Sequence, residues 1–198
     1  MVKRDAAGEE VGTGGLENPK PTDPMIDKVL GGRFRVLSVI ARGGMGKVYR
    51  AEQSPLSRVV ALKVLAPSSN QDDDLTVFKE RFFLEASTCA KLNHPNTVRV
   101  FDYGTTWDDV FYIAMEYLEG RTLQQVIRAD GVIPPLRLIR IAKQICGSLY
   151  EAHERGVIHR DLKPSNIFLT RHGDDPEFVK VLDFGLVKRL HDDAEMTD

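Results

Sequence analysis

Residues 159–166 read H-R-D-L-K-P-S-N, and they form the most informative stretch of this chain. They place a carboxylate, an ammonium group and a primary amide in one short loop, after an apolar helical segment and before an apolar strand. Asp161 could orient a hydroxyl nucleophile and accept its proton, while Lys163 could neutralise charge on a transferred group. Asn166 could bind a hard cation through its amide oxygen. The alternative is an ordinary polar loop that ends at a strand, and the spacing is too specific to favour it.

The tripeptide Asp183-Phe184-Gly185 follows the next apolar strand, predicted over residues 178–182. A carboxylate at the end of a strand, beside a glycine that can turn sharply, suits a Mg²⁺ ion held against phosphates. Taken alone, the tripeptide would be a chance turn. Its position shortly after residues 159–166 favours the functional interpretation.

A glycine-rich turn lies between the first two predicted strands, where residues 41–48 read A-R-G-G-M-G-K-V. Glycines allow the backbone to approach a phosphate group closely and to point N–H groups at it. The alternative is a simple hairpin turn, which is the commoner meaning of such a stretch. The turn therefore indicates a nucleotide site only in combination with other motifs.

Lys63 lies inside the apolar strand predicted over residues 58–65, where an ammonium group needs a partner. It either extends to solvent from an edge strand or holds phosphate oxygens and is itself held by a carboxylate. Glu85, on the following helix, is the candidate for that carboxylate. The alternative for Glu85 is a solvated position on the helix face, paired with Arg81.

The periodicity of apolar residues predicts five strands with one helix inserted among them, followed by mainly helical chain. This layout is α+β, with a change of character near Gly120. The predicted strands are 33–40, 47–51, 58–65, 97–103, 110–116, 166–169 and 178–182, and the predicted helices are 74–92, 122–129 and 136–155.

The composition is that of a soluble globular protein, with 198 residues, a net charge of −2 and 42% hydrophobic residues. This near-neutral balance gives no electrostatic reason to expect a nucleic-acid partner. Cys89 and Cys146 lie in apolar helical patterns, so we expect buried thiols in a reducing compartment. We find no apolar run of about 20 residues and no secretory signal, so we expect a cytoplasmic location and no membrane segment.

Taken in order, these motifs resemble the protein kinase family, and in particular bacterial Ser/Thr kinases of the eukaryotic-like (Hanks) type. The resemblance covers about residues 33–190. It is carried by the glycine-rich turn, the sequence Val60-Ala61-Leu62-Lys63, the helix residue Glu85, residues 159–166 and the D-F-G tripeptide.

The resemblance implies a protein-kinase-like α+β fold, with a five-stranded antiparallel N-lobe that carries one helix and a partial, mainly helical C-lobe. We expect a disordered leader over residues 1–27, the N-lobe over 28–118 and the partial C-lobe over 119–198. The chain then ends within the activation segment, before the A-P-E motif and the later C-lobe helices of the family.

The resemblance also implies transfer of the γ-phosphoryl group of ATP to Ser/Thr hydroxyls of a protein substrate, with ATP and Mg²⁺ as cofactors. Catalytic roles fall on Asp161 as the base, on Lys163, and on Lys63 paired with Glu85. Mg²⁺ would be held by Asn166 and Asp183, while His159 and Phe184 would be packing residues. The nucleotide would be contacted by Ile40, Ala41, Arg42, Gly43, Gly44, Met45, Gly46, Lys47, Val48, Ala61, Lys63, Met115, Glu116, Leu118 and Phe168.

Three details refine this expectation. Lys163 is similar to the lysine of Ser/Thr kinases, and Arg160 implies control by phosphorylation of the activation loop. Ala41 stands where the family has its first loop glycine, which is a departure from the pattern.

Two hypotheses for the whole chain stay open. In the first, the chain is part of a kinase whose missing segment is present in a longer protein. In the second, it is a truncated nucleotide-binding or partner-binding fragment without catalytic activity. A truncated C-lobe would expose apolar surface and favour association, so dimerisation is left open.

Overall fold

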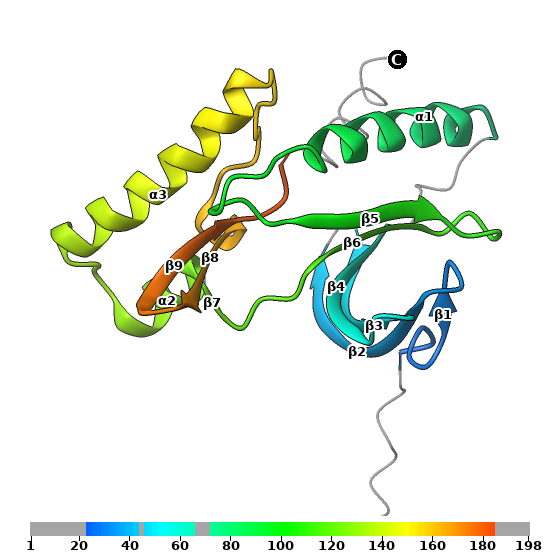
Figure 1. Ribbon diagram of the computed structural model, residues 1–198, viewed down its shortest axis with the longest axis horizontal. Coiled ribbons are helices and arrows are strands. Elements are labelled where there is room, and N and C mark those ends of the chain that lie inside the picture. Colours follow the sequence, from blue (N-terminus) through cyan, green and yellow to red (C-terminus); the bar gives the residue numbers. More distant parts are fainter. Residues whose placement is uncertain (1–22, 44–45, 66–71, 185–198) are drawn as a thin grey trace, which may run out of the picture.

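The structure is a computed structural model that describes residues 23–43, 46–65 and 72–184. It has two parts, shown in Figure 1: a larger sheet with helix α1 beside it, and a second part with α2, α3 and a smaller sheet. We call these the N-lobe and the C-lobe. The two-part α+β arrangement is the one that the sequence predicted.

The N-lobe sheet has six strands in the order β1-β2-β3-β4-β6-β5, and every neighbouring pair is antiparallel. Five of these strands were predicted, and the two-residue β1 at its edge was not, because two residues show no alternation. The strands are β1 (Val29–Leu30), β2 (Phe34–Gly43), β3 (Gly46–Gln53), β4 (Arg58–Leu65), β5 (Val100–Thr105) and β6 (Phe111–Glu116).

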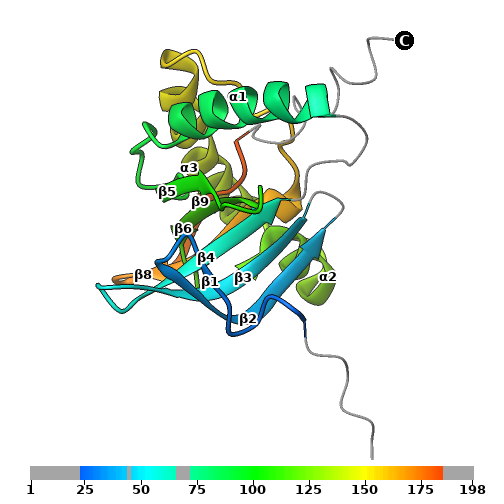
Figure 2. The ribbon, with the colours of Figure 1, turned by 90° about the vertical axis from the view of Figure 1, so that its right-hand side faces the viewer.

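Helix α1 (Asp72–Cys89) packs along one face of this sheet, as Figures 1 and 2 show from two directions. Aromatic rings make the contact: the centroid of the Phe111 ring lies 4.9 Å from that of Phe78 and 5.1 Å from that of Phe82. The opposite face of the sheet has its own apolar cluster, which includes Phe34 and Tyr49. The central strands are therefore buried on both faces, which explains their nearly continuous apolar sequences.

The C-lobe described here contains α2 (Leu123–Asp130), α3 (Pro135–Glu154), the 3₁₀ turn η1 (Pro164–Asn166) and a three-stranded antiparallel sheet. Its strands are β7 (Gly120–Thr122), β8 (Ile167–His172) and β9 (Asp175–Val181). Strands β8 and β9 were predicted, whereas the three-residue β7 was not. A capping box formed by Thr122 and Gln125 begins α2 at the predicted point.

Residues 96–98, between α1 and β5, are attached to the C-lobe rather than to the N-lobe sheet. Val98 N donates to Val181 O at 2.9 Å, and Val181 N donates to Asn96 O at 2.7 Å. Thr97 Oγ1 lies 2.7 Å from Ser148 Oγ on α3, and both hydroxyl groups are buried. The predicted strand 97–103 therefore begins only at Val100, because Thr97 and Val98 are bonded to β9 instead.

Residues 23–27 form a hydrogen-bonded turn, which corrects the expectation of a disordered leader over residues 1–27 for this part of the chain. The side chain of Asp23 is buried and bonded to the N-lobe, which explains the order of this turn. Residues 1–22 of the predicted leader lie outside the described residues.

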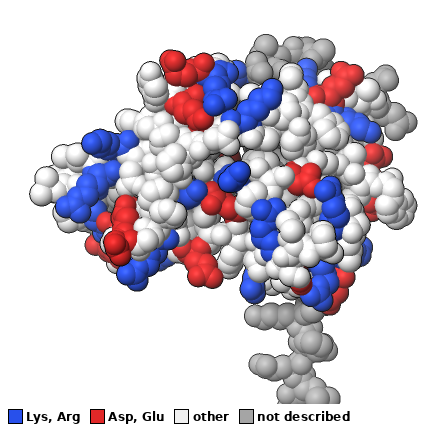
Figure 3. All heavy atoms as spheres, viewed as in Figure 1, with Lys and Arg blue, Asp and Glu red and all other residues white. Residues whose placement is uncertain are grey.

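The first part of α3 and the chain before it present apolar side chains to solvent. Val132, Leu136 and Ile139 are exposed, and so is Cys146, so the expectation that both thiols are buried is correct only for Cys89. On the face drawn in Figure 3, acidic and basic side chains are interspersed. Over the described residues, none of the helices combines the length and apolarity that a membrane span requires.

Candidate active site

Lys63 lies in the middle of the N-lobe sheet, and its side chain extends toward the end of β9. Strand β4 is bordered by β3 and β6, so the alternative in which Lys63 reaches solvent from an edge strand does not apply. Lys63 is only 9% exposed. Its Nζ lies 2.8 Å from Oδ1 of Asp183, which gives the ammonium group the carboxylate that burial demands.

Glu85, the predicted partner of Lys63, has a different position. It lines a cavity of about 260 Å³ between α1 and the chain before the 159–166 loop, together with Cys89 and Phe184. Among the described residues, Lys63 forms its ion pair with Asp183 and not with Glu85. The prediction that the following helix supplies the carboxylate is thus not met in this structure, because a carboxylate distant in sequence reaches the ammonium group.

Three predicted residues of the 159–166 loop are brought together. Lys163 Nζ lies 2.7 Å from Oδ2 of Asp161. Asn166 Nδ2 donates to the Asp161 main-chain oxygen at 2.9 Å and to Oδ2 at 3.2 Å. The 3₁₀ turn η1 positions these groups, since Asn166 N donates to Lys163 O and closes the turn.

The two predicted metal ligands, Asn166 and Asp183, flank one strand pair. Asn166 directly precedes β8, and Asp183 follows β9 closely. Leu182 N donates to Asn166 O at 2.8 Å, so the start of one strand is fixed to the end of the other. The sheet therefore brings together two residues that the sequence separates.

Two positions of the site have backbone conformations that non-glycine residues rarely adopt. The φ angle is +59° at Arg160 and +51° at Asp183. Such positions cost on the order of 1–3 kcal/mol each and persist where the surrounding structure holds them. Here the holding contacts include His159, whose Nε2 lies 2.8 Å from Leu182 O.

His159 and Phe184 are packing residues, as predicted. Both are buried, and their ring centroids lie 4.7 Å apart. Burial, with the Glu85 and Asp183 carboxylates nearby, raises the pKa of the Cys89 thiol to about 12. Its Sγ–H donates to Phe184 O, so Cys89 is a neutral core residue and not a nucleophile.

The glycine-rich turn is the hairpin between β2 and β3. Ala41 pairs with Val48, and Arg42 pairs with Lys47, so each pair shares one face of the hairpin. Arg42 and Lys47 were predicted nucleotide contacts, yet their side chains bind Asp23. The predicted contacts Gly44 and Met45 lie outside the described residues, and Ile40, Gly43 and Gly46 lie on the hairpin strands.

The remaining predicted nucleotide contacts lie around the connection between the lobes. Ala61 on β4 pairs with Met115 on β6, and both are buried. Leu118 lies between β6 and β7, and Phe168 lies on β8.

Glu116 connects the lobes through its side chain, a role that the sequence did not indicate. Its Oε1 accepts a hydrogen bond from Arg99 N at 2.8 Å and lies 2.7 Å from Nζ of Lys180 on β9. The position of Lys180 inside the apolar strand predicted over 178–182 was the one signal that its ammonium group needs a carboxylate partner. For Asp23 there was no signal, because it lies in a polar stretch without periodicity.

Comparisons with known proteins agree with this geometry. A family model described as Protein kinase domain matches residues 34–198. The serine/threonine-protein kinase pkn3 of Myxococcus xanthus is 43% identical over 167 residues, which are 84% of this chain and 30% of that protein. The crystal structure of the PknI kinase domain of Mycobacterium tuberculosis matches with a TM-score of 0.69 at 32% identity, over 82% of this chain and 61% of that chain.

A crystal structure of Rad53 in complex with AMP-PNP also matches, with a TM-score of 0.66 at 30% identity, over 78% of this chain and 38% of that chain. The fold is thus the two-lobed fold of a protein kinase. The chain belongs to the protein kinase family, and its curated relatives include Ser/Thr kinases of several bacteria. It spans less than a third of the length of these relatives.

Proposed function

We propose that this chain is the ATP-binding and phosphoryl-transfer part of a Ser/Thr protein kinase. The observation that carries the proposal is the position of two polar groups at the junction of the lobes, on chain segments joined by the hydrogen bond from Leu182 N to Asn166 O. One is the partly buried Lys63–Asp183 ion pair, and the other is the network of Asp161, Lys163 and Asn166. Membership of the kinase family supports the same conclusion.

ATP is the nucleotide that we propose, and the AMP-PNP complex of Rad53 supports this choice. The adenine ring would lie between the hairpin residue Val48 and Phe168, beside Ala61 and Met115. Lys63 would bind the α- and β-phosphates, because it is a buried cation on β4 and pairs with Val48 of the glycine-rich hairpin.

Asp161 would act as the base. A Ser or Thr hydroxyl of a protein substrate would donate its proton to the Asp161 carboxylate while its oxygen forms a bond with the γ-phosphorus. The bond between the γ-phosphorus and the β–γ bridging oxygen breaks, and ADP is the leaving group. Lys163, which lies beside the same carboxylate, would offset the negative charge on the transferred group.

The donors at Asn166 and Asp183 fit a magnesium ion. Mg²⁺ takes oxygen ligands and commonly binds through one or two carboxylates together with substrate phosphates. The Asn166 amide nitrogen is directed at Asp161, which leaves the amide oxygen for a cation. A bound Mg²⁺ would supply charge neutralisation at the phosphates, and Lys63 would then exchange its contact with Asp183 for phosphate oxygens.

Phosphoryl transfer from radiolabelled Mg·ATP to myelin basic protein tests the proposal. Replacing Asp161 with Asn should lower the rate by about a hundredfold to ten-thousandfold, because the shape is kept and the base is lost. Lys63→Met should lower turnover strongly while the chain still unfolds cooperatively in urea. Asp174→Asn is the matched control, since Asp174 is exposed in the turn between β8 and β9.

Equal rates for the wild type and Asp161→Asn would contradict the catalytic role. If the wild type bound AMP-PNP in calorimetry but transferred no phosphate, the second hypothesis, a nucleotide-binding fragment, would hold for these 198 residues.

A further inference from the structure

Asp23 is a buried carboxylate that the proposed chemistry does not use. Its side chain is 1% exposed, although it lies in the turn before the first strand. Oδ2 lies 2.9 Å from Lys47 Nζ and 3.2 Å from Arg42 Nη2. Oδ1 accepts hydrogen bonds from Tyr49 Oη at 3.1 Å and from Met25 N at 3.2 Å. Both oxygens are therefore fully engaged.

The three side-chain contacts come from one face of the nucleotide hairpin, by which we mean residues 41–43 and 46–49. Lys47 and Tyr49 point to the same side of β3, because side chains alternate along a strand. Arg42 is the cross-strand partner of Lys47 and shares that side. Ala41 and Val48 point to the other side, where the nucleotide is proposed to bind. Asp23 thus holds the hairpin from behind.

Electrostatics explain why a carboxylate is needed there. Arg42 and Lys47 are cations that face each other across the hairpin, and without an anion they would repel each other. The hydrogen bond from Lys47 is the main cause that holds the pKa of Asp23 below its ordinary value. Burial, followed by the bond to Asp23, raises the pKa of Tyr49 to about 12, so its hydroxyl stays protonated and donates.

We propose that Asp23 is a positioning residue for nucleotide binding: it clamps Arg42, Lys47 and Tyr49 and so keeps the nucleotide hairpin in its binding conformation. This inference rests on the proposed function, in which the hairpin covers ATP. The segment before the first strand is then a working part of the nucleotide site.

The clamp acts on affinity rather than on the chemical step. When the hairpin has its binding conformation in only a fraction of the molecules, the apparent dissociation constant of the nucleotide equals the intrinsic constant divided by that fraction. Once the nucleotide is bound, the hairpin is in place and the reacting groups in the C-lobe are unchanged. Loss of the clamp should therefore raise KM for ATP and leave kcat nearly constant.

Asp23→Asn tests the inference, because it keeps the shape and removes the charge. We expect the dissociation constant of AMP-PNP, measured by calorimetry, to rise about threefold to tenfold. Hydrogen exchange of the amides of residues 46–49 should become faster without nucleotide, while exchange in β5 and β6 stays as in the wild type. In a Lys47→Met background the effect of Asp23→Asn should shrink, because the two residues act together.

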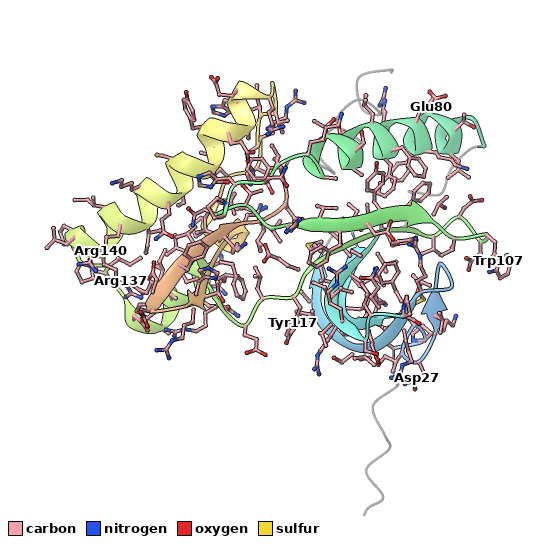
Figure 4. The ribbon with its side chains drawn as sticks, in the orientation of Figure 1. Asp27, Glu80, Trp107, Tyr117, Arg137 and Arg140 are labelled. Carbon is pink, nitrogen blue, oxygen red and sulfur yellow. The ribbon has the colours of Figure 1, made fainter. Side chains whose placement is uncertain are left out.

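Asp27→Asn is the matched control. Asp27 is exposed, lies four residues later and is labelled at the lower edge of the N-lobe in Figure 4. Unchanged AMP-PNP affinity and unchanged hairpin exchange in Asp23→Asn would overturn the inference. So would faster exchange spread equally over all six strands, which would indicate a purely structural role.

The two proposals can fail separately. If the wild-type chain did not bind AMP-PNP, the proposed function would fail, and Asp23 would position no nucleotide site. If the wild type bound AMP-PNP and Asp23→Asn bound it equally well, only the role of Asp23 would be lost.

Discussion

Gly46 is the residue at which the nucleotide hairpin depends most directly on backbone shape. Its φ angle is +141°, and a Cβ atom there would lie 2.1 Å from Val64 O on the neighbouring strand. Both facts exclude a side chain, because the conformation is open almost only to glycine and the obstacle is main chain. Gly46 therefore allows β3 to begin close against β4.

Gly46→Ala should lower the free energy of unfolding by roughly 3 kcal/mol, since strain and a backbone clash add together. It should also weaken AMP-PNP binding. Gly32→Ala is the comparison: Gly32 has a φ of +68° with open space around it, so the expected loss is about 1 kcal/mol. Urea unfolding of both variants measures these losses in the free energy of unfolding. Equal losses would show that the main chain shifts and removes the clash between the new Cβ atom and Val64 O.

Contacts between site residues could be predicted where the residues are close in sequence, and could not where they are far apart. Asp161, Lys163 and Asn166 lie within six positions, so their meeting follows from one loop. The partner of Lys63 is 120 residues away, and the prediction chose a carboxylate on the next helix instead. Only the folded chain shows which of two carboxylates reaches a buried ammonium group.

At the scale of elements, α3 holds the loop that follows α1. The Glu151 carboxylate accepts hydrogen bonds from His94 N at 2.7 Å and from Asn93 N at 3.1 Å. Partial burial favours a higher pKa for Glu151, but the two amides and Arg155 together lower it below its ordinary value. The charged form is therefore the one that stabilises the fold.

The stabilisation by Glu151 should depend on pH. Because its pKa is lower in the folded chain, its contribution is complete above the ordinary value of 4.5 and is lost as the pH falls through the folded pKa. Near neutral pH, the free energy of unfolding of Glu151→Gln should be about 1–2 kcal/mol lower than that of the wild type. That gap should narrow in acid, below the ordinary pKa.

Urea unfolding of Glu151→Gln at several pH values measures this gap. Glu154→Gln is the control, because Glu154 is an exposed residue of the same helix. A gap that stayed constant in acid would mean that the charge of Glu151 is not what holds the loop.

Elements with strong patterns were predicted well, and short ones were not. The strand at 58–65 has the bounds of β4, because a continuous apolar run lies between polar residues. Strands β1 and β7 have two and three residues, too few for any periodicity. They form because longer neighbours, β2 and β8, offer backbone groups to pair with.

At the scale of the whole molecule, one ion pair joins the lobes beside the proposed adenine site. Lys180 on β9 and Glu116 at the end of β6 are 14% and 22% exposed. Lys180 also approaches Thr97 O at 3.5 Å. The pair therefore connects the strand that precedes Asp183 with the chain that crosses between the lobes.

Lys180→Met should lower the free energy of unfolding by roughly 1–3 kcal/mol, because it leaves the Glu116 carboxylate without its cation. The double variant Glu116→Gln/Lys180→Met should lose less than the sum of the single changes. Lys143→Met, at an exposed position on α3, is the control. Additive losses in chemical denaturation would show that the two side chains act independently.

The attachment of residues 96–98 to β9 and α3 has a consequence for motion. The main chain of the N-lobe sheet is joined to the C-lobe by the covalent crossing after Glu116 and by these bonded residues before β5. The two connections lie side by side, because Glu116 N donates to Arg99 O at 2.9 Å. Bending between the lobes should therefore be concentrated at this shared hinge, with Arg42 and Lys47 of the hairpin travelling farther than Asn96.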